Sequence, residues 1–156
     1  MGILDLLCFA PDTETIVTAI PQEFIRGIHS LEPRHQGSVV TIGSFDGVHK
    51  GHKAIIRQVQ QQADKLNLAS VVMTFEPQPH EYFSGDKAPA RLMRVRDKAR
   101  ALFAAGIDRV LCLSFNRRLS SLSAEQFVKQ ILVDGLGVKY LGVGDEFRFG
   151  GDRSGD

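Results

Sequence analysis

The chain has 156 residues and a mass of 17.2 kDa, the length of one ordinary domain that can bury a core without disulfides or metals. With 43% hydrophobic and 24% charged residues, its composition is typical of a soluble globular protein rather than of a disordered or membrane-spanning one. The net charge of +1 gives no electrostatic footprint for nucleic acid or an anionic membrane.

The N-terminal residues and the cysteines indicate the cellular compartment in which the protein is located. The apolar run 3–10 is interrupted by Asp5 and has no basic residue before it, so it lacks the pattern of a secretory signal. Cys8 and Cys112 fit neither a disulfide framework nor a zinc spacing, which favours a reducing compartment. We therefore expect a cytoplasmic protein, in which residues 1–22 form an extension of unknown role.

The first half of the chain predicts two strands and one helix. The β-branched run 38–43 predicts a buried strand, and apolar residues at helical spacing predict an amphipathic helix over about 51–66. A second buried strand follows at 68–75. The stretch 77–89, with three prolines and no periodicity, predicts a loop.

The second half continues this alternation. A helix is expected from Val95 to near Gly106, then a strand over 109–114. A capping box of Ser123 and Gln126 predicts a third helix, and a fourth strand is expected over 138–143. One face of that helix is predicted to carry Ala124, Phe127, Val128, Ile131 and Leu132. Strands that alternate with helices predict an α/β, Rossmann-like fold with a parallel sheet and crossover helices.

Other residues lead to simpler expectations. Cys112 lies inside an apolar strand and is expected to be an inert core residue. His29 and His35 are expected at the surface. The basic residues of 91–118 are expected to form a solvated helix face, with a phosphate-facing patch as the alternative. Aromatic residues that would suit nucleic acid are not interleaved with them. These basic residues are Arg91, Arg94, Arg96, Lys98, Arg100, Arg109, Arg117 and Arg118.

In an open parallel sheet, ligands bind outside the carboxyl ends of the strands. The first such loop is Gly-Ser-Phe-Asp-Gly-Val-His-Lys-Gly-His over 43–52. Its glycines permit close approach of the backbone to a ligand, and His49 and His52 bracket a helix start that attracts phosphate. An H-x-G-H element in this context resembles the nucleotidyltransferase superfamily, which uses it to hold ATP phosphates. The alternatives are a glycine-rich turn with two surface histidines, or a zinc site that also takes His80.

Aromatic residues mark two further loops at the same edge. Residues 74–83, Thr-Phe-Glu-Pro-Gln-Pro-His-Glu-Tyr-Phe, combine two prolines with three rings, and residues 144–150, Gly-Asp-Glu-Phe-Arg-Phe-Gly, add two more. Each could be an ordinary turn whose rings reach the core. Together they favour a site for a ligand that has a planar ring and a phosphate.

Five segments in order make the resemblance specific: GSFDGVHKGH, TFEPQPHEYF, RLMRVRDKARALFAAGID, LSAEQFV and VGDEFRFGGDRSGD. The chain from about Phe24 resembles the N-terminal module of prokaryotic FAD synthetase, the bifunctional riboflavin kinase/FMN adenylyltransferase family. We therefore expect residues 23–156 to be an FMN adenylyltransferase domain. The resemblance implies transfer of AMP from MgATP to FMN, which gives FAD and pyrophosphate.

The resemblance also implies which residues would bind substrates. His49 and His52 would stabilise charge on the transferring phosphoryl group. The ATP loop would comprise Gly43, Ser44, Phe45, Asp46, Gly47, His49, Gly51 and His52. The FMN-binding residues would be Pro77, Pro79, Phe83, Glu146, Phe147 and Phe149. No protein metal site is expected, since Mg²⁺ would arrive with ATP. The expected partners are the small molecules FMN and ATP, with no nucleic acid and no membrane, and the sequence does not define the oligomeric state.

Two departures from the family pattern leave alternatives open. Position 44 is Ser where Asn is usual, and the sequence ends at Asp156 before the family's Ser/Thr-x-x-Arg segment and its riboflavin kinase domain. We therefore expect a C-terminally incomplete domain without the kinase domain. The alternatives are another H-x-G-H nucleotidyltransferase with a different phosphate acceptor, or a non-catalytic flavin- or nucleotide-binding module.

Overall fold

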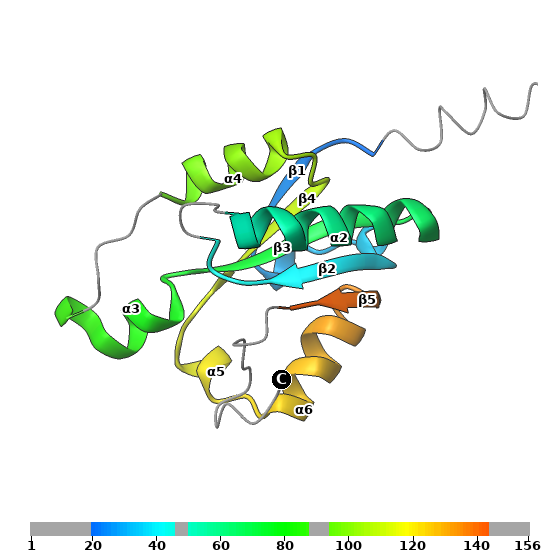
Figure 1. Cartoon of the computed structure of the whole chain (residues 1–156). Coiled ribbons are helices and arrows are strands. Elements are labelled where there is room, and N and C mark those ends of the chain that lie inside the picture. The colour runs from blue at the N-terminus through cyan, green and yellow to red at the C-terminus, as the bar shows by residue number, and fades with distance from the viewer. Residues whose placement is uncertain (1–19, 46–49, 88–93, 144–156) are drawn as a thin grey trace, which may run out of the picture.

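The structure, a computed structural model, describes residues 20–45, 50–87 and 94–143 around a five-stranded sheet (Figure 1). All neighbouring strands are parallel, in the spatial order β1-β4-β3-β2-β5. The strands are β1 (Glu23–Arg26), β2 (Ser38–Ile42), β3 (Ala69–Glu76), β4 (Arg109–Ser114) and β5 (Val138–Gly142). The α/β fold with a parallel sheet that the sequence predicts is confirmed.

Helices cover both faces of this sheet (Figure 1). One face carries α2 (Lys50–Leu66) and α4 (Val95–Ala104), and the other carries α5 (Arg117–Ser120) and α6 (Ala124–Phe127), which continues as a π-helix over Val128–Val133. Short 3₁₀ turns occur at Ile28–Ser30, Pro33–His35 and Gly85–Lys87. The helices on one face connect strands that follow one another in one direction across the sheet, and the helices on the other face connect strands in the opposite direction. This arrangement keeps every crossover right-handed.

Two apolar layers hold the sheet between these helices. Alternate residues of a strand point to opposite faces, so Met73 packs on the side of α6 while Val72 packs beneath α2 and α4. Burial on both faces explains why the central strands are unbroken apolar runs. The larger layer is Ile25, Val40, Ile42, Val71, Met73, Phe75, Leu111, Leu113, Phe127, Ile131, Leu132 and Leu136.

The sequence analysis missed β1, α3 and the four-residue α5. β1 has only four residues, too few to show a period, and its place is set by pairing with β4. The stretch 77–89 was expected to be a loop, yet α3 occupies Pro79–Ser84. Pro79 stands at the first helical position and the Glu81 carboxylate accepts a hydrogen bond from the Gln78 N–H at 2.8 Å, so local start signals rather than periodicity form this helix.

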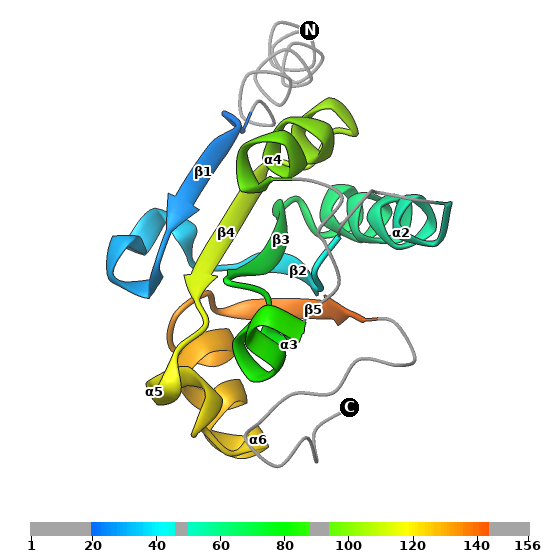
Figure 2. The same ribbon diagram turned by 90° about the vertical axis from the view of Figure 1, so that its left-hand side faces the viewer.

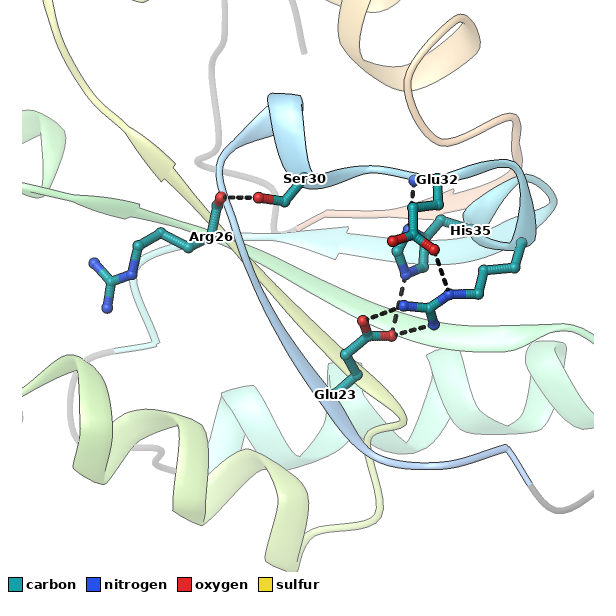
Figure 3. Close-up of polar contacts among 6 residues, drawn as sticks. Glu23, Arg26, Ser30, Glu32 and His35 are labelled. Carbon is teal, nitrogen blue, oxygen red and sulfur yellow. Dashed lines mark hydrogen bonds and ion pairs between the residues drawn. The ribbon is translucent and has the colours of Figure 1, made fainter.

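The expectation that His35 lies at the surface is wrong: its side chain is 1% exposed. The Glu32 N–H donates to Nδ1 at 2.8 Å, and Nε2 lies 3.1 Å from a Glu23 carboxylate oxygen (Figure 3). Arg34 donates two further hydrogen bonds to Glu23, each 2.6 Å long. The ring can be buried because both of its nitrogens have partners.

The expected solvated face of basic residues also needs correction. Lys98 is 1% exposed and Arg109 8%, because α4 and β4 turn these two side chains inward. Arg91 lies outside the described residues. Val128, expected on the buried face of the third helix, is 37% exposed, since the π-helix that begins there changes the spacing of the face. Cys112 is buried in β4, as the sequence predicts.

Candidate functional site

The strands all end at one edge of the sheet, which we call the carboxyl edge; Figure 2 looks onto it, with α3 in the foreground. β5 pairs with β2, although β3 and β4 lie between these two strands in the sequence. The direction of winding therefore reverses between β2 and β5. In doubly wound folds this reversal opens the crevice in which ligands bind.

The loop after β2 is fixed to the core by Phe45. This residue has a φ of 51°, in the left-handed region that non-glycine residues rarely adopt, and its side chain is 2% exposed. The ring packs with Ile56 and Val72 in the layer beneath α2. A Cβ at Gly43 would lie 3.0 Å from the Phe45 ring, so a larger residue here would require the ring to shift by a few tenths of an ångström. Backbone strain held in this way is common where a loop serves a ligand.

His52 lies in the first turn of α2, directly against this anchor. Its ring centroid is 4.8 Å from that of Phe45, with the planes tilted by 45°. The imidazole therefore has a defined position near the start of a 17-residue helix, where backbone N–H groups and the helix dipole favour an anion. The arrangement suits a histidine that donates a hydrogen bond to a phosphate oxygen.

The described part of the predicted ATP loop is thus Gly43, Ser44, Phe45, Gly51 and His52. Asp46, Gly47 and His49 lie outside the described residues. Among the described ones, Phe45 is buried, so any contribution to nucleotide binding comes through the shape that its ring imposes on the loop.

The predicted flavin side places its described residues at α3. Pro77 and Pro79 flank Gln78 at the start of this helix, and Phe83 on the helix is 68% exposed. Glu146, Phe147 and Phe149 lie outside the described residues. A largely exposed Phe on a short helix at the carboxyl edge is an available surface for stacking.

Phe83 belongs to a group of three rings, the aromatic platform of Tyr82, Phe83 and Phe115. Their centroids are 5.2 to 5.8 Å apart, and all three pairs meet edge to face. Phe115 also contacts Phe75 at 5.6 Å, which ties the platform to the sheet. The sequence analysis did not single out Phe115, although its place directly after a predicted strand could have identified it.

The charged groups that act on the buried Cys112 thiol are of both signs. Burial raises the pKa of the Cys112 thiol, and the negative charge of Glu76 raises it further while Arg26 and Lys98 oppose this. Cys112 therefore remains a thiol rather than a reactive thiolate. Nothing in its surroundings suggests nucleophilic catalysis.

The described residues contain neither a metal-ion cluster nor a membrane-spanning helix. No group of three His, Cys, Asp or Glu residues there could hold a metal ion. The zinc alternative involves His49 and His80, and His49 and the His80 side chain lie outside the described part. Among the described helices, none is long and apolar enough to cross a membrane.

Comparisons with known proteins agree on one family. A family profile described as FAD synthetase matches residues 31–156. The chain is 56% identical over 134 residues to a bifunctional riboflavin kinase/FMN adenylyltransferase of Pseudomonas fluorescens, and 53% identical over 135 residues to that of Escherichia coli K12. Each alignment covers 86% of this chain and 43% of the relative. The chain therefore spans less than half the length of these curated relatives.

A solved structure shares the fold. It is a chain described as a macrolide-efflux protein from Streptococcus pneumoniae, with a TM-score of 0.70 and 27% sequence identity. The match covers 85% of this chain and 44% of that one.

Proposed function

The chain belongs to the FAD synthetase family, and from this premise we propose that it forms the FMN adenylyltransferase part of such an enzyme. An oxygen of the FMN phosphate attacks the α-phosphorus of ATP. The bond from this phosphorus to the oxygen that bridges to the β-phosphate breaks, pyrophosphate leaves, and FAD is formed. No covalent enzyme intermediate is required, so positioning and charge stabilisation supply the catalysis.

The nucleotide side is the loop after β2 and the first turn of α2. His52 and His49 would donate hydrogen bonds to phosphate oxygens as negative charge moves onto the leaving pyrophosphate. Gly43, Ser44, Asp46, Gly47 and Gly51 would bring the backbone close to the phosphates. The strained, core-anchored Phe45 supports this assignment, because it holds the loop and the His52 ring in one arrangement.

The flavin side is α3 with the residues that precede it. Pro77, Pro79 and Phe83 would contact the isoalloxazine ring, as would Phe147, Phe149 and Glu146. The observation that carries the proposal is the shared carboxyl edge: an exposed aromatic platform and a phosphate-type helix start lie at the ends of adjacent parallel strands.

Mg²⁺ enters as MgATP, a substrate whose phosphates and water supply most of its ligands. The other partners of the chain are small molecules, FMN and ATP, and we place its reaction in the cytoplasm. We further propose that a longer parent protein, like the bifunctional relatives, phosphorylates riboflavin to FMN with a separate domain.

Two other functions would use the same site. A related nucleotidyltransferase would keep the phosphate loop and adenylylate a different acceptor. A non-catalytic module would bind flavin or nucleotide without turnover.

The experiment is to incubate the chain with FMN, ATP and Mg²⁺ and to measure FAD by chromatography. FAD formation that His49→Ala abolishes supports the adenylyltransferase and removes the non-catalytic module. A separate titration follows FMN fluorescence, which a stacked flavin loses. A folded chain that neither quenches FMN nor forms FAD contradicts the flavin assignment.

A further inference from the structure

Thr74, in β3, places a hydroxyl inside an apolar layer. The residue is 0% exposed and lies two positions after Val72, so it faces the layer beneath α2 and α4. A buried hydroxyl loses its hydrogen bonds to water and lowers the stability of the fold unless a partner replaces them. A valine of the same shape would fill this position without that cost, so packing alone does not explain the hydroxyl.

The partner of this hydroxyl lies just beyond the neighbouring strand β2. Thr74 Oγ1 donates to the Ser44 carbonyl at 3.5 Å. In the described ranges, the last backbone hydrogen bond between β2 and β3 runs from the Gly43 N–H to the Met73 carbonyl at 3.1 Å. Beyond it, one segment turns into the loop proposed for ATP and the other continues to the loop proposed for flavin. Thr74 therefore links these two loops just past the end of the backbone pairing.

The bond acts on the peptide group between Ser44 and Phe45. Phe45 has a φ of 51°, which a residue other than glycine keeps only when its surroundings hold it there. Its side chain is 2% exposed, and its ring centroid lies 4.8 Å from that of the His52 ring. A change in the tilt of this peptide group would therefore move Phe45, and with it the support of His52.

We infer that Thr74 is a positioning residue for adenylyl transfer, whose hydroxyl orients the peptide group between Ser44 and Phe45 and through it His52. The inference rests on the proposed function. At 3.5 Å the bond is at the long limit for a hydrogen bond, so it contributes little to the stability of the fold without substrates. Hydrogen bonds of a catalytic site are often long before substrates bind and tighten in their presence. We expect this one to shorten once ATP fills the loop.

Thr41 of β2 provides a matched comparison. It is also 0% exposed, and its register with Val72 places it on the same face of the sheet as Thr74. Its Oγ1 is buried without a hydrogen-bond partner. The two threonines therefore differ in the property that matters, because one hydroxyl bonds to the loop and the other bonds to nothing.

The test compares the full chain with its Thr74→Val, Thr74→Ser and Thr41→Val variants. FAD formation from FMN, ATP and Mg²⁺ gives kcat and the KM of each substrate, and urea unfolding without ligands gives the midpoints. Thr74→Val should lower kcat about threefold to tenfold, as expected for one lost hydrogen bond. The KM values should change much less, because the substrates keep their binding groups while the groups that stabilise the transition state are misplaced. Thr41→Val should retain the wild-type kcat and unfold at the same or a higher urea concentration.

The serine variant separates positioning from packing. Thr74→Ser keeps the hydroxyl and deletes a buried methyl group, whereas Thr74→Val keeps the shape and deletes the hydroxyl. Thr74→Ser should therefore be the less stable but the more active of the two. If Thr74 served the fold alone, activity would follow stability, and Thr74→Val would be the more active variant.

Three results overturn the role of Thr74. They are a Thr74→Val variant with the wild-type kcat, a Thr74→Ser variant as slow as Thr74→Val, and an equal loss of kcat in Thr41→Val. A wild-type chain that forms no FAD overturns the proposed function, and this role with it. Failure of the proposed function is thus seen in the wild type, and failure of the inference in the variants alone.

Discussion

His52 owes its position to Phe45, whose ring is held in the core at a φ of 51°. If the imidazole acts, as proposed, on charge that develops during phosphoryl transfer, its loss should affect the rate more than substrate binding. We expect His52→Ala to lower kcat by about 10²- to 10³-fold while the Kd for FMN changes much less. Steady-state kinetics and flavin quenching measure the two quantities.

The matched control is His29→Ala, an exposed histidine in the turn after β1. It should leave both quantities unchanged. Equal losses of kcat and FMN affinity in His52→Ala would contradict a role in charge stabilisation.

At the opposite end of the sheet, Glu23 links acid stability to the cluster in Figure 3. Hydrogen bonds from Arg34 and His35 lower the pKa of Glu23 from 4.5 to about 2, against the opposing effect of burial. A carboxylate with a lowered pKa in the folded state stabilises the protein above its unfolded pKa, and this contribution is lost as protons bind. The free energy of unfolding should therefore fall between pH 4.5 and about 2.

Glu23→Gln should be less stable than the wild type at neutral pH and should show a flatter acid limb in urea titrations at several pH values. Glu125→Gln, at an exposed position on α6, should retain the wild-type slope. An unchanged acid limb in Glu23→Gln would show that the ion pair contributes nothing in solution.

Among the elements, α3 presents Phe83 to solvent, so this ring contributes little to folding. If it stacks on the flavin, Phe83→Ala should weaken FMN binding about threefold to tenfold, as expected for one aromatic contact, with an unchanged urea midpoint. Leu66→Ala, at the far end of α2 and 44% exposed, is the control that should retain FMN affinity. Unaltered quenching by Phe83→Ala would remove the ring from the site.

Elements with a clear period were the ones that sequence reasoning could predict. The four longer strands and the helices that begin near Gly51 and Val95 follow from apolar spacing, and Ser123 and Gln126 form the predicted capping box. β1 and α3 were missed because four and six residues cannot display a period. Their existence depends on pairing with β4 and on the local bond from Gln78 to Glu81.

In the candidate site, too, some residues could be predicted from the sequence and others could not. His52 and Phe83 could be assigned from motifs, because glycine spacing and proline-aromatic runs are visible in one dimension. The contact of Phe115 with Phe83 and the burial of Gln78 could not, since both depend on which loops the strand order brings together, although the place of Phe115 after a predicted strand marked it as a candidate. The error at His35 has the same origin, because its partner Glu23 is twelve positions away.

For the whole molecule, the site spans loops on several strands, so its ligands should stabilise the entire fold. A ligand that binds only the folded state at one hundred times its Kd adds about 2.7 kcal/mol to the free energy of unfolding. We expect FMN to raise the urea midpoint of the chain accordingly, with a smaller rise at the same concentration in Phe83→Ala. No rise at concentrations that quench flavin fluorescence would mean that the site forms in a part of the chain that is not coupled to the sheet.

β3 runs three residues past the end of β2: their pairing stops at Ile42 and Met73, and Thr74 to Glu76 continue against β4 alone. The Phe115 N–H donates to the Glu76 carbonyl at 3.3 Å just beyond them. The base of the loop proposed to bind flavin therefore rests mainly on β4, while on the β2 side the Thr74 hydroxyl donates to the Ser44 carbonyl at 3.5 Å. A deep mutational scan scored on FAD formation should accordingly find sensitive positions at Cys112 and Leu113, which touch no substrate, and milder effects at equally buried Val39 and Val40 of β2.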